Sequence, residues 1–154
     1  MSIRELLVVA AAALLTAAAF MGSGGSAPTL VADAVRTPGV VNPDVTQETI
    51  GSTICRDGWT RTIRPPTSYT SDLKVKQMHE YGVTGSPDEF QEDHLISLEL
   101  GGDPTDPRNL WPEPIERAER VDKIENELNA KVCSGALTLA EAQRQESELK
   151  HLDG

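Results

Sequence analysis

The chain has 154 residues and a formal net charge of −10. That length leaves room for one domain with a single modest core. The acidity argues against a protein that holds nucleic acid by its overall charge, because phosphate binders usually present a basic surface. An enzyme with a local basic segment and an acidic metal site stays compatible with this composition.

The first residues predict an export signal. Arg4 precedes an apolar run from Leu6 to Gly22, whose length suits a signal peptide, and small residues follow the run. We expect residues 1–34 to contain the signal, with cleavage after Ala27 or after Ala34. An uncleaved membrane anchor is the alternative, although the run is short for a full span. We therefore predict a secreted or otherwise exported protein with no stable membrane association after cleavage.

Export changes what is expected of the cysteines. Cys55 and Cys133 are the only two, an even number in an oxidising compartment. We predict a disulfide that ties the start of the domain to the end of its main helix, and chain-entropy estimates give about 4 kcal/mol for such a long loop. Two unrelated buried thiols are the alternative. Their number and spacing fit no zinc-finger pattern.

The predicted elements begin after a linker. Residues 35–52 are rich in Thr, Pro and Val without helical periodicity, which favours an extended lead-in to the domain. Residues 53–70 carry Asp-Gly and Pro-Pro among β-favouring residues, so short strands and turns are expected there. A short helix is predicted from Ser71 to a stop at Gly82. Alternating apolar residues then predict a strand over 92–100.

The main helix is expected in the second half of the chain. Pro114 suits a first helical position, and the helix should run to about Val132. Its helical spacing creates an apolar stripe of Ala118, Val121, Leu128 and Val132. Glu125 falls inside this stripe, where a carboxylate is costly unless it is paired or bound to a metal. Glu125 is therefore a candidate functional residue.

A last helix is predicted after a Cys-Ser-Gly sequence. Thr138 is expected to cap it, with Glu141 three residues later in a capping-box pattern. Residues 147–154 are predicted to form a polar C-terminal tail.

The stretch EDHLISLELGGDPTDPRNLWPEP, residues 92–114, carries the candidate chemistry. It places His94 beside Asp93 on the predicted strand, and Asn109 in the loop before the helix that brings back Glu125. A neutral His can take a proton from an attacking water near neutral pH. Oxygen ligands such as Asp, Asn and Glu suit one divalent ion that stabilises charge on a phosphate. The stretch therefore predicts hydrolysis of a phosphodiester.

The same stretch resembles the signature of the HNH (ββα-metal) endonuclease superfamily, and more closely a group of small, exported bacterial HNH-like proteins. The likeness extends over roughly residues 42–143. It implies an α+β fold with a small ββα-metal core, additional short strands and flanking helices, in a domain over residues 53–146. It also implies an endonuclease that depends on one divalent ion, Mg, Mn or Zn, and cleaves nucleic acid, with DNA as the leading substrate and RNA as the alternative.

The resemblance also implies roles for single residues. His94 would be the general base and Asp93 a metal ligand. Asn109 would fix the loop and the base, or bind the metal. The helix ligand is usually His or Asn in the superfamily; no such residue stands out here, so Glu125, or else Asp122, is the substitute. Ser97 departs from the Pro that relatives tend to carry, and the chain after residue 143 is more polar than in the group.

The segment between residues 56 and 76 is locally basic, with five basic and two acidic residues and thus a net charge of +3. The candidates for phosphate contact are Arg56, Arg61, Arg64, Lys74 and Lys76. Scattered solvated charges are the alternative. The competing hypothesis for the whole protein is a non-catalytic exported binding or structural module that retains an HNH-like scaffold, which net acidity and the missing helix His favour.

Overall fold

The computed structural model of the protein describes residues 30–152, so the predicted signal up to residue 29 lies outside the described residues. Within that range the fold is α+β, with four α-helices and one two-stranded antiparallel sheet. In chain order the elements are α1 (Trp59–Ile63), α2 (Thr67–Glu80), β1 (Phe90–His94), β2 (Leu110–Pro114), α3 (Ile115–Cys133) and α4 (Leu139–His151). The α+β class expected from the sequence is confirmed.

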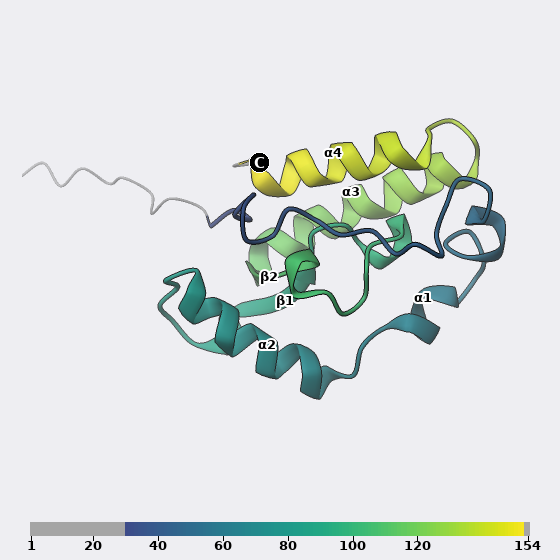
Figure 1. Ribbon diagram of the computed structural model, residues 1–154. Coiled ribbons are helices and arrows are strands. Elements are labelled where there is room, and N and C mark those ends of the chain that lie inside the picture. Colours follow the sequence, from purple (N-terminus) through teal and green to yellow (C-terminus); the bar gives the residue numbers. More distant parts are fainter. Residues whose placement is uncertain (1–29, 153–154) are drawn as a thin grey trace, which may run out of the picture.

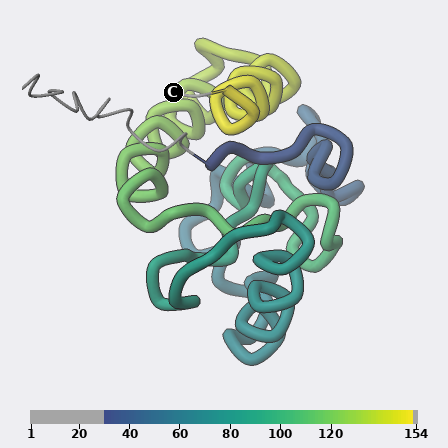
Figure 2. The backbone as a smooth tube through the Cα atoms, turned by 90° about the vertical axis from the view of Figure 1, so that its left-hand side faces the viewer, coloured from purple at the N-terminus to yellow at the C-terminus, as the bar shows by residue number. Residues whose placement is uncertain are grey.

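The sheet is the centre of the arrangement. β1 and β2 pair so that Asp93 lies opposite Trp111 and His94 opposite Leu110. The chain passes from β2 directly into α3, and both α2 and α3 contact the two strands. Figure 1 shows the sheet between α2 on one side and the α3–α4 pair on the other. α4 lies along α3 in Figure 1, and Figure 2, which views α4 nearly end-on, shows the two helices side by side. The residues at the end of β1 are therefore enclosed by helices.

The apolar stripe predicted on α3 is confirmed. Ala118, Val121, Leu128 and Val132 are buried, and Glu125 is buried with them. Leu128 and Val132 join a core that also takes side chains from the loop after β1 and from α4, namely Ile96, Leu100, Leu139 and Ala142. Burial of this stripe on two sides gives α3 a fixed rotation, and that rotation points Glu125 inward.

The predicted disulfide is present. Cys55 and Cys133 are bonded across a sequence separation of 78, with their Cα atoms 5.5 Å apart. The bond ties the turn before α1 to the last residue of α3, and it is compatible with an extracytoplasmic location. Over residues 30–152, the chain forms no helix with the length and apolar character needed to cross a membrane.

Three of the predicted elements differ from the structure. The short strands expected over residues 53–70 are replaced by turns, α1 and the first residues of α2. The strand predicted over residues 92–100 begins at Phe90 but ends at His94, and its last three residues form a 3₁₀ turn. The predicted polar tail is wrong up to residue 151, because α4 continues through it and Lys150 is fully buried.

The residues predicted as a linker pack onto the domain. Val45 is buried in the main core, and the backbone N–H of Asn42 donates to the carbonyl of Gly101. Upstream of them, Ala32 is buried against Leu95 and Trp111. The chain before α1 thus packs over the turn that follows β1 (Figure 1).

Candidate functional site

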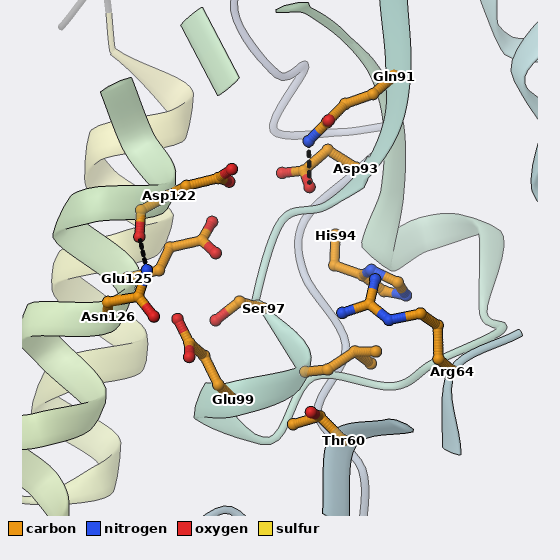
Figure 3. Close-up of a pocket in the computed structure, with 11 residues that line it drawn as sticks. Thr60, Arg64, Gln91, Asp93, His94, Ser97, Glu99, Asp122, Glu125 and Asn126 are labelled. Carbon is orange, nitrogen blue, oxygen red and sulfur yellow. Dashed lines mark hydrogen bonds between the residues drawn. The ribbon is translucent and has the colours of Figure 1, made fainter. Parts of the chain in front are cut away.

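A polar cavity of about 320 Å³ opens where the end of β1 faces α1 and α3. One wall is acidic and carries Glu99, Asp122 and Glu125, while His94 and Arg64 line the opposite side (Figure 3). The first three come from the loop after β1 and from α3, and Arg64 directly follows α1. The structure therefore brings the predicted His94 and Glu125 to one cavity and adds a guanidinium to it.

His94 is held by the loop across the cavity. Its Nε2 lies 3.0 Å from the carbonyl oxygen of Pro104, and the ring is buried. A carbonyl can only accept, so Nε2 carries the proton and Nδ1 of the neutral ring keeps a lone pair. Burial lowers the pKa of His94, with Lys150 and Arg64 adding to the effect against Pro104 and Asp93. The imidazole is consequently neutral near pH 7 and able to accept a proton at Nδ1.

Asn109 is fully buried beneath this loop. Its Oδ1 accepts from the N–H of Ile96 at 3.0 Å and of Val40 at 3.2 Å. Its Nδ2 donates to the carbonyls of Ile96 at 3.0 Å and Asp103 at 2.9 Å. All four bonds go to the backbone, and Asn109 is absent from the cavity lining. In this structure Asn109 is not placed to bind a metal, because its oxygen already accepts from two N–H groups.

Asn109 reaches His94 through the loop. It fixes the carbonyl of Asp103, and the next residue, Pro104, is the acceptor for the imidazole. A close approach makes this possible: a Cβ on Gly102 would lie 1.8 Å from the carbonyl oxygen of Ile96 and 2.7 Å from Nδ2 of Asn109. The second residue of the Gly-Gly pair thus has to be glycine for the amide to sit where it does.

Asp93 points into the cavity beside α3. Its Oδ1 accepts from Nε2 of Gln91 at 3.1 Å, and its Oδ2 lies 2.7 Å from Nζ of Lys150 (Figure 3 shows the first bond). The same ammonium lies 2.6 Å from Oε1 of Glu125. Burial alone would raise the pKa of Asp93, but the Lys150 ammonium and hydrogen bonds from Glu113 and Lys150 reverse the effect and lower it. Asp93 is therefore an ionised partner of Lys150.

Further buried charges surround this pair. Lys150 is 0% exposed, and Glu146, one turn earlier on α4, is also fully buried, with both oxygens accepting from the N–H of Ser97. On β2, Glu113 pairs with the buried Arg117. Burial raises the pKa of Glu113 to about 8 and Asp93 adds to the rise, while Lys150 and Arg117 oppose it. We call Asp93, Glu113, Arg117, Glu125, Glu146 and Lys150 the charged cluster.

The side chains predicted to bind a divalent ion already have other partners. Asp93 and Glu125 each turn a carboxylate oxygen to Lys150, and Asn109 is committed to the backbone. Among residues 30–152, no three His, Cys, Asp or Glu side chains are grouped so as to hold a metal ion. Asp122, the alternative helix ligand, lines the cavity from an exposed position. The three predicted ligands therefore do not fit a metal in this structure.

The predicted basic strip is divided among separate places. Arg64 lines the cavity, whereas Arg56 lines another depression beside the disulfide. Lys74 donates to the carbonyls of Pro87 at 2.7 Å and Phe90 at 2.8 Å, so it holds the turn before β1 and is not free for phosphate. Lys76 is exposed 3.7 Å from Glu80, and Arg61 is exposed on α1. One of the five residues reaches the site.

Sequence reasoning missed Lys150 and Glu146, the α4 half of the charged cluster. A signal for both existed. Leu139 and Ala142 begin a helical stripe whose next members, by steps of four, are Glu146 and Lys150. These are charged residues on an apolar face, the same pattern that singled out Glu125. Because residues 147–154 were predicted to form a polar tail, no buried role was expected for Lys150 or for Glu146, which directly precedes that tail.

Comparison of the chain with known protein families, with characterised proteins and with solved structures gave no significant match. The assignment of a function therefore depends on the geometry of the site and on the sequence motif.

Proposed function

We propose that this chain is an exported endonuclease of the HNH (ββα-metal) type that hydrolyses phosphodiester bonds in nucleic acid, with DNA as the leading substrate and RNA as the alternative. The order β1, β2, α3, with the motif His at the end of the first strand, supports the ββα assignment. The main support is the contact between Nε2 of His94 and the carbonyl of Pro104. It leaves Nδ1 of this neutral, cavity-lining ring as a proton acceptor.

The chemistry follows from these positions. Nδ1 of His94 takes the proton of a water as its oxygen attacks phosphorus, and the phosphorus–oxygen bond to the leaving group breaks. The guanidinium of Arg64 is the cavity-lining cation on the His94 side (Figure 3). A planar guanidinium suits phosphate oxygens, so Arg64 would hold the scissile phosphate near the base. Asn109 would act as a positioning residue through the loop.

Strand cleavage in supercoiled plasmid tests this proposal. The oxidised protein is incubated with plasmid under Mg²⁺, Mn²⁺ or Zn²⁺ and under chelator, and nicked product is measured. We expect His94→Ala to lose at least about 100-fold in rate, the usual size of a general-base contribution. His79→Ala, an exposed histidine on α2, is the matched control and should cleave like the wild type. Cleavage that survives His94→Ala contradicts the assignment.

One observation favours the alternative, a non-catalytic exported module on the same scaffold. The acidic wall of Glu99, Asp122 and Glu125 faces the space a phosphate would enter, and its carboxylates repel an anion unless cations offset them. Burial raises the pKa of Glu99 to about 7, so this repulsion grows as the pH rises through neutrality. Absence of cleavage under every condition, with the fold intact, would favour the module.

A further inference from the structure

We propose that the ammonium of Lys150 is the resident cation of this site, standing where a divalent ion would otherwise bind Asp93 and Glu125. This inference rests on the proposed function for the activity of the cavity, but the identity of the cation beside the acidic groups can be tested independently of cleavage. The family resemblance implies a bound metal here, whereas Asp93 and Glu125 contact the ammonium of Lys150 instead.

The surroundings of Nζ are those of a hard cation. Four oxygens approach it: Oε1 of Glu125 at 2.6 Å, Oδ2 of Asp93 at 2.7 Å, the carbonyl of His94 at 2.5 Å and Oε1 of Glu146 at 3.4 Å. Carboxylate and carbonyl oxygens are the ligands of Mg²⁺, Mn²⁺ and Ca²⁺. A lysine ammonium is a compact point charge that can replace such an ion electrostatically.

The position of Lys150 is fixed by its backbone as well. Its carbonyl accepts from the N–H of Ala32 at 3.0 Å, and the carbonyl of Leu149 accepts from Nη2 of Arg117 at 2.9 Å. Glu146 anchors the preceding turn of α4 to the N–H of Ser97. Three segments distant in sequence thus hold the last turn of α4, and these contacts fix the position of the Lys150 ammonium.

Charge balance explains why a cation is needed. Asp93, Glu125 and Glu146 surround Nζ, and Lys150 is the cation in contact with all three. Without its charge, three buried carboxyl groups would face one another with no ion pair, which strongly destabilises a fold. Removing the ammonium while keeping the volume of the side chain should therefore turn the same oxygens into a site that takes up a divalent ion.

The experiment measures Mn²⁺ binding and its effect on thermal unfolding, with the full oxidised protein. Wild type, Lys150→Met and Lys131→Met are compared; Lys131 is exposed in the last turn of α3 and is the matched control. We expect Lys150→Met to melt lower than wild type in chelator. Saturating Mn²⁺ should then raise its Tm by at least about 5 °C, while wild type and Lys131→Met shift by much less.

Two outcomes would overturn the inference. The first is a stoichiometric Mn²⁺ site in the wild type that Asp93→Asn abolishes, measured by equilibrium dialysis. The second is a folded Lys150→Met that gains no Mn²⁺ site. If Lys150→Met does not fold even with Mn²⁺, the dialysis of wild type and Asp93→Asn decides alone, and a wild type without a Mn²⁺ site supports the inference.

These results are separable from those on cleavage. A protein that cleaves no plasmid but behaves as expected with Mn²⁺ would refute the nuclease proposal and leave the role of Lys150 standing. A wild type that cleaves only with a divalent ion bound at Asp93 would refute the role of Lys150 and support the nuclease.

Discussion

Asn109 and Lys150 are both fully buried, and both hold the backbone where β1 ends, yet they are built differently. Asn109 gives a neutral amide to four backbone groups, two of them on Ile96, 13 residues away in sequence. Lys150 places a charge beside Asp93, 57 residues away, and beside the carboxyl groups of Glu125 and Glu146. Asn109 also reaches Val40, 69 residues away, so both residues join segments distant in sequence. We call Asn109 with its four backbone partners the neutral centre, and Lys150 with its carboxyl partners the ionic centre.

The two centres differ in how they respond to pH, salt and the loss of one member. A neutral amide with every bond made holds its loop without regard to pH or salt. An ionic centre balances a large desolvation cost against Coulomb attraction, so losing one member exposes the cost of the others. The neutral centre is suited to fixing the imidazole of His94, and the ionic centre is suited to setting the charge of the cavity.

The largest expected effect on stability comes from the neutral centre. Asn109→Ala leaves the N–H groups of Val40 and Ile96 and the carbonyls of Ile96 and Asp103 without partners. At the usual cost of unsatisfied buried groups, we expect a loss of about 4 kcal/mol in the free energy of unfolding, measured in urea. Asn126→Ala, on the exposed side of α3, is the control. Equal losses in the two variants would show that the loop does not depend on the amide.

Local patterns in the sequence predicted the parts of the fold that local forces determine. The stripe on α3 gave the burial of Glu125, and Thr138 caps α4 by accepting from the N–H of Glu141, as expected. The disulfide followed from cysteine number and compartment. Each of these depends on neighbours within one or two turns, or on a single pair without competitors.

Long-range contacts explain the failures. Apolar alternation continues past His94, but Asn109 and Glu146 take the backbone N–H groups of Ile96 and Ser97, so the strand stops and turns. No local pattern contains those two partners. The pairing of Lys150 with Asp93 is equally remote, and a charged helix end looks the same whether it is solvated or buried. Charge placement in the site was therefore the part least open to prediction.

A smaller effect is expected at the edge of the ionic centre. Ala32 donates to the carbonyl of Lys150 and is buried against Leu95 and Trp111, and the N–H of Asp33 donates to the hydroxyl of Tyr81 at 3.0 Å. A chain beginning at residue 35 loses all of these. We expect its free energy of unfolding to be about 2 kcal/mol lower than that of a chain beginning at residue 28, because hydrogen bonds and apolar burial are lost.

The two chains also bear on export. Cleavage after Ala27 keeps the Ala32 segment, whereas cleavage after Ala34 removes it from Lys150. Urea unfolding of both chains, with the mass of the secreted protein, tests whether the cell keeps the segment. Equal stability of the two chains would mean that the segment contributes nothing to the ionic centre.

The smallest effect concerns Glu92, whose carboxyl group has, within residues 30–152, neither a backbone hydrogen bond, as Asn109 has, nor a contacting cation, as Asp93 has. It lies on β1 next to Asp93, and both of its carboxyl oxygens are buried without a hydrogen-bond partner among the described residues. Burial raises its pKa to about 8; Asp93 adds to this and Lys74 opposes it. A carboxyl with no counter-ion in contact and no backbone donor is thus kept neutral.

The sign of the pH effect follows from that raised pKa. The folded state holds the Glu92 proton that the unfolded chain loses near its ordinary pKa, so stability is greatest in acid and falls as the pH rises from about 4.5 to about 8. His94 acts oppositely, since its lowered pKa costs stability as the pH falls below about 6.5.

Glu92→Gln isolates the carboxyl, because His94 is the same in both proteins. The variant should gain about 1 kcal/mol over wild type at pH 8 and nothing at pH 4.5, in urea unfolding at both values. Glu119→Gln, on the exposed face of α3, is the control and should leave the pH profile unchanged. If Glu92→Gln is no more stable than wild type at pH 8, the carboxylate must be solvated or paired there, and β1 would contain no buried acid outside the charged cluster.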